Sequence, residues 1–441
     1  MSDPVNTSRT SGFELPEEGK EIITRNSQFA ARNVTYDALV LDGSLRQSLA
    51  TVRSLGSRGL RVAALETFES SSVPAFSSRW CQQRFVCSAK HGTEAYLTYL
   101  EQLLDYISVR VLIPSSDGTI ALIRRHRELL EQRVRIALAK EPALGIAISK
   151  EQTLAIARQL GLGVPRAVTV GAVSEVAAAL HEIGLPAVVK PVQSWAWAWD
   201  GQQGTRIKSQ LVTTPDEARH AVEELTRFGG TTLFQEFLSG RRESLSLFYA
   251  NGEVYARFAF WGKRTNPPLG GLYTLRQAIA FPADTGEQAE RLVREIGLEG
   301  YSQVEFRRDA AGKPYLMEIN PRLNLAIAHA VSAGVDFPSL LYQWASGEPI
   351  ARVKSYPTGG WMRYLSDDIR ATVASLRQRG RPGVPSPARA IFDFCLSFFI
   401  PMKYDYLEWR DLRPAWTATK GFFAHYWSRL LGRRLSRGKS Q

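Results

Sequence analysis

Residues Tyr301–Arg322 read YSQVEFRRDAAGKPYLMEINPR, and this stretch decides the fold prediction. Two runs within it, YSQVEFRRD and PYLMEIN, alternate in residue type and are rich in the aromatic and branched side chains that favour strands. A short segment containing Gly312 separates the runs and supplies a turn. The pattern therefore predicts a β-hairpin.

The register of this hairpin follows if Asp309 pairs with Pro314. The pairs that result are Arg307–Leu316, Glu305–Glu318 and Gln303–Asn320. Because side chains alternate along a strand, these residues share one face. Like charges directly opposite each other destabilise a sheet, and a hard cation such as magnesium, the usual ion beside phosphates, removes the conflict. The alternative is a solvated hairpin whose glutamates pair with Arg307 or Arg322.

The set Glu305, Glu318, Asn320 and Arg322, ending in EINPR, resembles the metal-binding end of the ATP-grasp ligases. This superfamily includes biotin carboxylase, carbamoyl phosphate synthase and D-alanine–D-alanine ligase. The resemblance implies ATP and Mg2+ as cofactors, with two ions held by Glu305, Glu318 and Asn320. It assigns Arg322 to the negative charge that develops on an acyl phosphate and on the tetrahedral intermediate.

The same resemblance implies a fold class of α/β and α+β type. A doubly wound, pre-ATP-grasp domain is followed by a two-lobed ATP-grasp fold and by a C-terminal, mostly helical extension. A chain of 441 residues with 44% hydrophobic residues is long enough for two or three packed units. We expect a flexible tail over 1–34, a Rossmann-like domain over 35–148, an ATP-grasp domain over 149–351 with lobes of about 149–232 and 233–351, and an extension over 352–441.

Strand and helix signals alternate in the first of these domains. YDALVLD (36–42), RVAALE (61–66) and VRVLIPSSD (109–117) read as strands, with a helix opening between the first two. This order predicts a small parallel sheet. In ATP-grasp ligases a similar domain helps to hold the substrate other than the nucleotide, which would place these residues near the cleft: Ser44, Arg46, Ser115, Ser116 and Asp117. Capping and loop-structuring roles are the alternative for each.

Two lysines are candidates for phosphate contacts. Lys190 ends an apolar strand, AVVKP, and Lys150 lies in the first turn of a helix capped by Ser149. A cation at a helix N-terminus is unfavourable unless an anion is near, which favours a function for Lys150. Lysines placed like these contact the α- and β-phosphates in ATP-grasp enzymes. A solvated surface position is the alternative for Lys190.

The segment LFQEFLSGRRE (233–243) resembles the superfamily's hinge between lobes. The nucleotide-binding candidates here are Gln235, Glu236, Phe237, Leu238 and Glu243. By the resemblance, the Glu236 carbonyl accepts from the adenine amino group, the Leu238 amide donates to the ring, and Glu243 binds the ribose hydroxyls. An edge strand followed by a glycine turn is the alternative.

One segment departs from the superfamily. Relatives usually carry a Gly/Ser-rich loop over the phosphates, whereas this chain has QSWAWAWDGQQG (193–204). Trp195, Trp197 and Trp199 alternate with alanine and would line one side of an extended segment. They form either a lid that excludes water from ATP or grips an apolar acceptor, or a hairpin packed on its own lobe.

The superfamily's chemistry implies an ATP-dependent carboxylate–amine ligase that forms an amide or peptide bond through an acyl phosphate and releases ADP. An amino acid, a peptide or a uronic-type sugar acid is the expected substrate class, and the chemistry requires no nucleophilic side chain. Lys263 and Arg264, in a glycine-flanked loop, are candidates to reach the transferred phosphate. Arg276 and His329 are weaker candidates, for which core or surface roles are favoured. The rival interpretations are a non-catalytic ATP-binding scaffold in a membrane-associated complex and, with less support, a nucleic-acid binder.

The formal charge of +12 is concentrated at the C-terminus, where seven basic residues and no acidic one follow Asp411. Phe422, Phe423 and further apolar residues to Leu431 fall at helical spacing beside these bases. Peripheral contact with a membrane or an acidic partner is one expectation, and docking on the ligase core is the other. The polar N-terminus lacks a run typical of a signal peptide, and three cysteines have neither zinc-like nor redox spacing, so we expect a cytoplasmic protein with buried, reduced thiols.

Overall fold

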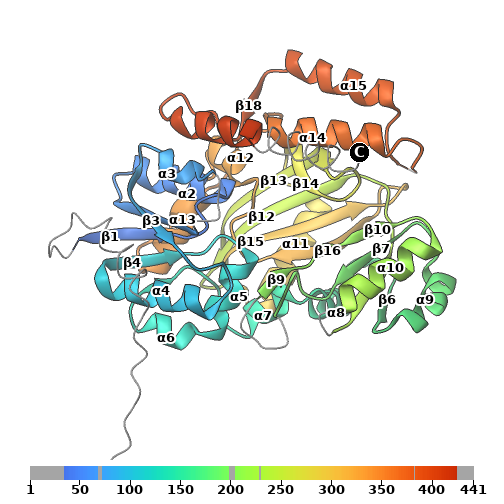
Figure 1. The fold of residues 1–441 in the computed structure, drawn as a ribbon, viewed down its shortest axis with the longest axis horizontal. Coiled ribbons are helices and arrows are strands. Elements are labelled where there is room, and N and C mark those ends of the chain that lie inside the picture. The colour runs from blue at the N-terminus through green and yellow to red at the C-terminus, as the bar shows by residue number, and fades with distance from the viewer. Residues whose placement is uncertain (1–33, 68–71, 198–203, 228–229, 382, 425–441) are drawn as a thin grey trace, which may run out of the picture.

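The computed structural model describes residues 34–67, 72–197, 204–227, 230–381 and 383–424, so nearly all of the expected N-terminal tail lies outside the described residues. Figure 1 shows the blue N-terminal domain beside a central sheet in yellow and orange, a small green lobe, and the orange and red C-terminal helices along one edge.

A five-stranded parallel sheet in the order β3-β2-β1-β4-β5 forms the N-terminal domain. Its strands are β1 (Thr35–Val40), β2 (Val62–Thr67), β3 (Cys81–Cys87), β4 (Ser108–Ile113) and β5 (Arg135–Ile136). Its helices are α2 (Arg46–Ser57), α3 (Pro74–Ser77), α4 (Glu94–Tyr106), α5 (Asp117–Arg125), α6 (Arg127–Glu131) and α7 (Ala143–Ile148). Both faces of the sheet are covered, because Ala38 and Val40 pack in one apolar cluster and Leu39 and Leu41 in another. The expected doubly wound domain is confirmed.

The cysteines follow the expectation only in part. Cys81 and Cys87, at the two ends of the unpredicted strand β3, are buried free thiols, and burial raises the pKa of each to about 11. Cys395 is a free thiol but exposed, which corrects the expectation that all three are buried.

The next lobe along the chain is a four-stranded antiparallel sheet in the order β10-β7-β11-β6. Its elements are α8 (Lys150–Gln159), β6 (Ala167–Val170), η1 (Val173–Glu175), α9 (Val176–Ile183), β7 (Ala187–Pro191), β10 (Gln210–Val212), α10 (Pro215–Thr226) and β11 (Thr232–Glu236). Residues of α9 and α10 pack on one face around Phe234 and form the lobe's own core. Because β11 completes this sheet, the lobe extends to residue 236 rather than 232. A separate small hairpin, β8 (Trp195–Trp197) and β9 (Gly204–Arg206), follows β7.

The second lobe is built on a seven-stranded sheet in the order β16-β15-β12-β13-β14-β17-β18. Its first elements are β12 (Arg242–Ala250), β13 (Glu253–Asn266), β14 (Leu272–Ile279), α11 (Ala283–Ile296), β15 (Gly300–Arg308), β16 (Pro314–Asn320), α12 (Ile327–Ser332) and α13 (Phe337–Ser346). Asn251 and Gly252 form the tight turn between β12 and β13 with φ of 50° and 78°.

The C-terminal extension is mostly helical, as expected, but it is not a separate unit. Its elements are β17 (Trp361–Arg363), α14 (Leu365–Arg377), α15 (Pro387–Leu396), η2 (Ser397–Phe399) and β18 (Met402–Tyr404), and residues 413–424 are also helical. Its two strands extend the seven-stranded sheet. Buried Asp405, just after β18, lies between Arg276 of β14 and Arg46 of α2, and so ties the extension to both other parts of the chain. None of the helices in the described ranges combines the length and apolarity needed to cross a bilayer.

Candidate active site

The β15–β16 hairpin brings the predicted acidic residues together. The observed pairs include Gln303–Asn320 and Glu305–Glu318, as predicted. Beyond Glu305 a β-bulge leaves Met317 as the extra residue, so Arg307 lies opposite Tyr315 rather than Leu316. The turn end of the predicted register is therefore wrong by one residue, with Arg308 opposite Pro314.

The physical reason lies in Asp309, which leaves the ladder to organise the turn. Its side chain accepts hydrogen bonds from the backbone amides of Ala311 and Lys313, both at 2.9 Å. An aspartate that bonds the amides just ahead of it stabilises a turn, so Asp309 belongs to the turn and not to the strand.

Glu305 is buried in a polar network on the face that it shares with Glu318. Arg242 donates to its Oε2 at 2.9 Å and Tyr273 donates to the same atom at 3.2 Å. Gln303 donates to its Oε1 at 3.1 Å, and Asn320 donates to Glu318 Oε1 at 3.4 Å. The carboxylates, the Asn320 amide and their donors thus converge on one patch of the sheet.

The two glutamates are shifted in opposite directions. Burial raises the pKa of Glu305, Arg242 opposes this, and the charge of Glu318 adds to it. Burial also disfavours ionised Glu318, but Lys150 and Lys190 outweigh it and lower the pKa of Glu318. The lysines therefore stabilise the ionised form of Glu318, whereas ionised Glu305 is unfavourable and a bound cation would stabilise it.

Cations surround this acidic pair. Lys150 is buried, lies 3.9 Å from Glu318 Oε2 and donates to Ser194 Oγ at 3.1 Å. Burial lowers the pKa of Lys190 to about 8, and the charges of Lys150, Arg242 and Arg307 contribute in the same direction. Such mutual repulsion among cations marks a place where an anion with several charges is favourable.

Buried Arg307 strengthens this argument. Its Nη1 donates to the Leu269 carbonyl, but its Nε has no hydrogen-bond partner among the residues that the structure describes. Burial, together with Arg242, lowers the pKa of Arg307 to about 10. A buried donor without a partner is costly, so an acceptor from a ligand would stabilise this region.

Arg322 connects the hairpin to the N-terminal domain. Its Nε donates to Asp117 Oδ1 at 2.6 Å, and Arg206 Nη2 lies 3.8 Å from Asp117 Oδ2. A pocket opens at this junction, lined among others by Asp117, Lys150, Ser194, Trp195, Glu318, Asn320 and Arg322. Of the polar residues expected near the cleft, Asp117 is therefore the one that lines it.

Trp195 crosses from the β8–β9 hairpin to the N-terminal domain. A Cβ atom at Gly92 would lie 2.4 Å from its ring, and one at Gly118 would lie 2.7 Å from it. The ring therefore occupies space that only glycine leaves open at these two positions. This geometry favours the lid interpretation of Trp195 over packing on its own lobe. Nothing is described of the Trp197 side chain, and Trp199 lies outside the described residues.

The hinge candidates lie at the end of β11. Gln235 is 1% exposed, and both atoms of its side-chain amide lack a partner within the described ranges. The register pairs Gln235 with Val188 and Leu233 with Lys190, so Gln235 and Lys190 share a face of the sheet. This face is opposite to the lobe's own core. An unpaired amide there can both donate to and accept from a heterocycle.

The neighbouring hinge side chains are engaged with the protein. The Glu236 carboxylate binds the Arg166 amide and guanidinium at 2.9 and 3.0 Å. The Phe237 ring lies 4.8 Å from the Arg307 guanidinium, and Leu238 is buried. The resemblance to ATP-grasp ligases assigns adenine to main-chain groups, the Glu236 carbonyl and the Leu238 amide, and this assignment stays a prediction.

Three sequence candidates are not brought to this site. Glu243 lies on the opposite face of β12, because its neighbour Ser244 is the one that pairs with Glu305. Its carboxylate accepts from Arg308 at 2.9 and 3.0 Å, so it is already neutralised. Arg264 lies in β13 rather than in a loop, and its guanidinium binds Asp368 of α14 at 2.6 and 2.7 Å. Lys263 is exposed, 5.6 Å from the Trp361 ring.

Arg276 and His329 have the core roles that were favoured for them. Arg276 is fully buried and bonded to Asp405. Burial lowers the pKa of His329 to about 3, and its Nε2 lies 3.1 Å from the Gly360 carbonyl.

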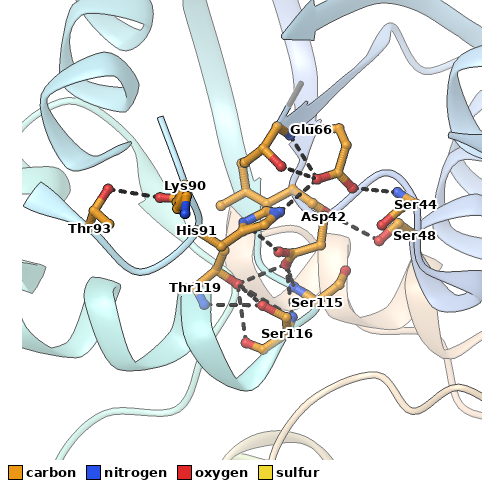
Figure 2. A network of polar contacts seen from close by, with 12 residues as sticks. Asp42, Ser44, Ser48, Glu66, Lys90, His91, Thr93, Ser115, Ser116 and Thr119 are labelled. Carbon is orange, nitrogen blue, oxygen red and sulfur yellow. Dashed lines mark hydrogen bonds and ion pairs between the residues drawn. The ribbon is translucent and has the colours of Figure 1, made fainter. Parts of the chain in front are cut away.

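A second polar cluster lies at the carboxyl ends of β1, β2 and β4 (Figure 2). The amides of Ser115 and Ser116 donate to Asp42 at 3.0 and 2.8 Å, and the Ser44 amide donates to Glu66 at 2.7 Å. These serines thus have the loop-structuring role that was the alternative for them. Arg46 is buried against Asp405 and Tyr364, so it too is structural.

His91 lies between the two buried carboxylates of this cluster (Figure 2). Its Nε2 is 2.6 Å from Glu66, and its Nδ1 is 3.6 Å from Asp42. His91, Glu66 and Asp42 are not among the residues that the sequence predicts for a site, and neither are Arg242 and Tyr273 of the main site. Their partners lie far away in sequence, so no local pattern marks them.

The chain is similar to known proteins in sequence and in fold. A family model described as "ATP-grasp in the biosynthetic pathway with Ter operon" matches residues 231–366. The D-alanine–D-alanine ligase of Chromohalobacter salexigens is 26% identical over 218 residues, which cover 45% of this chain and 64% of that ligase. The chain thus spans less than two thirds of this curated relative.

Solved structures share the fold at lower identity. The biotin carboxylase domain of the Hydrogenobacter thermophilus 2-oxoglutarate carboxylase, in complex with MgADP, ADP and bicarbonate, has a TM-score of 0.58 at 16% identity, over 74% of this chain and 73% of that one. The L-amino acid ligase of Bacillus licheniformis has a TM-score of 0.53 at 18% identity, over 72% and 75%.

Proposed function

We propose that this chain, which belongs to the ATP-grasp superfamily, is an ATP-dependent ligase that joins a carboxylate to an amine. The observation that carries the proposal is the pairing of Glu305 with Glu318 near Lys150 and Lys190. Glu318 and Lys150 line a pocket together with Arg322. Acidic and basic groups in this order suit a metal-bound polyphosphate at one end and a carboxylate substrate at the other.

Glu305, Glu318 and Asn320 are the residues that would hold magnesium. Oxygen donors fit this hard cation, and the raised pKa of Glu305 supports a neutralising ion beside it. The described residues contain no cluster of three or more His, Cys, Asp or Glu side chains suited to a metal, so phosphate oxygens and water would complete the coordination. When bound, magnesium neutralises phosphate charge.

The protein groups would bind the nucleotide at both ends. Lys150 and Lys190 bind phosphate oxygens, and Arg242 and Arg307 add positive charge behind them. The main chain of Glu236 and Leu238 binds adenine, and the unpaired Gln235 amide adds a donor and an acceptor on the same side. Trp195 covers the pocket and excludes water.

The proposed reaction has two steps. A substrate carboxylate oxygen takes the γ-phosphoryl group of ATP, and the bond to the β-phosphate oxygen breaks to release ADP. An amine nitrogen then forms a bond to the acyl carbon, the phosphate leaves with the electron pair of the broken C–O bond, and the amine loses a proton. Arg322 stabilises the negative charge on the acyl phosphate and on the tetrahedral intermediate. Amino acids, peptides and uronic-type sugar acids are the substrate classes to test.

The test is release of ADP in the presence of Mg-ATP and a panel of carboxylates with amines. We expect release only with a matching pair, and at least a hundredfold loss of kcat in Glu318→Gln. The matched control is Glu131→Gln, at an exposed ion pair with Arg127, which should leave turnover unchanged.

Two outcomes would reject parts of this proposal. Full turnover in Glu318→Gln would remove the metal assignment. Tight binding of ATP without turnover across a broad panel would instead favour the non-catalytic scaffold.

A further inference from the structure

Large apolar side chains are unusually exposed on the C-terminal extension. Fourteen such side chains are exposed in the described part of the chain, and ten of them lie between residues 391 and 423. We define the aromatic surface by its six aromatic members, which are Phe392, Phe398, Phe399, Trp409, Trp416 and Phe423. Phe399 and Trp409 are 83% and 80% exposed. Single exposed apolar residues are ordinary, but a cluster of this kind marks an interaction site.

The first half of the aromatic surface comprises Phe392 on α15 and Phe398 and Phe399 on η2. α15 binds the protein through its other side. The guanidinium of Arg264 donates to the Asp393 carbonyl at 3.1 Å and to Ser397 Oγ at 3.0 Å. Ala390 is the residue of α15 that is buried. Phe392 and Leu396 are spaced as i and i+4, and both are exposed, so the outward face of α15 is apolar.

The second half comprises Trp409, in the turn after β18, and Trp416 and Phe423 on the helical residues 413–424. This helix is docked through one side, because the Arg370 guanidinium of α14 lies 5.3 Å from the Phe422 ring and Ser72 donates to the Thr417 carbonyl at 3.1 Å. Trp416 and Phe423, seven residues apart, are both 64% exposed on the other side. This helix is therefore docked on α14 of the extension itself and on the N-terminal domain at Ser72, whereas Phe423 is exposed. The other apolar residues of the expected helix, up to Leu431, lie outside the described residues.

Both halves lie along the same edge of the molecule. Figure 1 shows α15 in orange and the red C-terminal helix on the upper side, with α14 next to them. α14 contributes Arg370 to the contact with Phe422 and also packs against α15. The helices that carry most of the aromatic surface are therefore neighbours through α14.

Charge indicates what covers this surface. Between residues 387 and 424 five basic residues are exposed, namely Arg389, Lys403, Arg410, Arg413 and Lys420. Of the four acidic residues in this range, Asp405 and Asp411 are buried in ion pairs, Asp393 pairs with Arg389, and Glu408 is exposed, so the exposed charge is positive on balance. Five more basic residues and no acidic one follow residue 424 in the sequence. A second copy of this chain would bring the same cations against one another, whereas an anionic surface complements them.

We propose that the aromatic surface binds the face of an anionic lipid bilayer. Phe and Trp side chains enter the interface, and the neighbouring Lys and Arg side chains reach the headgroups. Lys420 and Trp416 already have this arrangement, since the Lys420 ammonium lies 5.2 Å from the indole ring. The proposal does not rest on the ligase reaction.

The test is flotation of the full-length protein with vesicles of phosphatidylcholine alone or mixed with phosphatidylglycerol. We expect binding to the mixed vesicles that weakens as salt is added. The double variant Phe399→Ser/Trp409→Ser should bind at least about tenfold more weakly, because two large aromatic side chains no longer enter the interface. Lys403→Glu/Lys420→Glu should weaken binding to mixed vesicles only. The matched control is Tyr106→Ser, at an exposed aromatic residue of α4.

Unchanged melting temperature and ATP binding would establish that each variant is folded. Flotation of the Phe399→Ser/Trp409→Ser variant equal to that of the unmodified chain would overturn the proposal. So would a concentration-dependent dimer, or binding to single-stranded nucleic acid, in a protein that does not float with either vesicle.

Discussion

Arg322 donates to Asp117 at 2.6 Å, and this one hydrogen bond joins the residues after β16 to the first turn of α5. Asp117 holds the Arg322 guanidinium at the edge of the pocket, where the negative charge of Glu318 also attracts it. The N-terminal domain therefore holds in place the arginine that we propose stabilises the acyl phosphate.

Replacing Asp117 with Asn should disturb the position of Arg322 without weakening the binding of ATP. We expect kcat to fall about 10- to 100-fold, because Arg322 loses a charge-assisted hydrogen bond and its orientation. The dissociation constant for ATP, measured by calorimetry, should stay within a few-fold. Asp105→Asn, at an exposed pair with Arg133, is the control. A kcat that does not change in Asp117→Asn would show that this contact does not position Arg322.

The opposite pKa shifts of Glu305 and Glu318 predict opposite effects on the ligand-free protein. The raised pKa of Glu305 means that its ionisation costs stability as the pH rises through the folded-state pKa. The lowered pKa of Glu318 means that its charge contributes stability above the unfolded-state value, which is lost at acid pH.

At pH 7 and without magnesium, Glu305→Gln should therefore raise the melting temperature, and Glu318→Gln should lower it. In both variants, stabilisation by Mg2+ with a non-hydrolysable ATP analogue should be reduced. Shifts of the same sign in the two ligand-free variants would contradict this account of the pair.

The acidic end of the hairpin was predictable because it depends only on local information. Strand alternation places Glu305 and Glu318 on one face, and that rule needs no knowledge of other strands. The register predicted at the turn end is wrong because the Asp309 side chain binds backbone amides of the turn and a β-bulge leaves Met317 without a partner in the ladder. A bulge shifts the register without any change in composition, so the sequence does not mark it.

Residues whose partners are distant in sequence were assigned wrongly or missed. Arg264 binds Asp368, which is 104 positions away, and Arg242 binds Glu305, which is 63 positions away. Basic residues near a glycine-rich segment occur in loops and in strands alike, so the local sequence does not reveal the partner of Arg242 or of Arg264. The partner of Arg242 follows from the pairing of β12 with β15, and the partner of Arg264 follows from the docking of α14. The role of Gln235 in nucleotide binding stays a prediction, and its unpaired side-chain amide supports it.

Gly118 provides a test of the lid. A methyl group at this helical position would meet the Trp195 ring at 2.7 Å, whereas Gly92 has a φ of 70° and would also strain the backbone. Gly118→Ala should not destabilise the protein, since alanine favours a helix by about 1 kcal/mol over glycine. It should raise KM for ATP several-fold, because Trp195 no longer closes fully. In a Trp195→Ala background the same change should have no effect on KM, and an equal effect in both backgrounds would exclude the contact as its cause.

The His91 cluster predicts how stability depends on pH. Although burial opposes ionisation of Glu66, hydrogen bonds from His91 and the Ser44 amide lower its pKa to about 2. The folded-state pKa is below the ordinary value of 4.5, so this stabilisation is complete above pH 4.5 and is lost as the pH falls toward 2.

His91→Ala leaves a buried carboxylate without its imidazole partner and should cost about 3 kcal/mol at pH 7. Urea unfolding should show that this cost shrinks below pH 4.5, and that Glu66→Gln in the His91→Ala background recovers part of it. His181→Ala, at an exposed position of α9, should be neutral throughout, and a His91→Ala cost that stays constant from pH 7 to pH 3 would contradict the role assigned to Glu66.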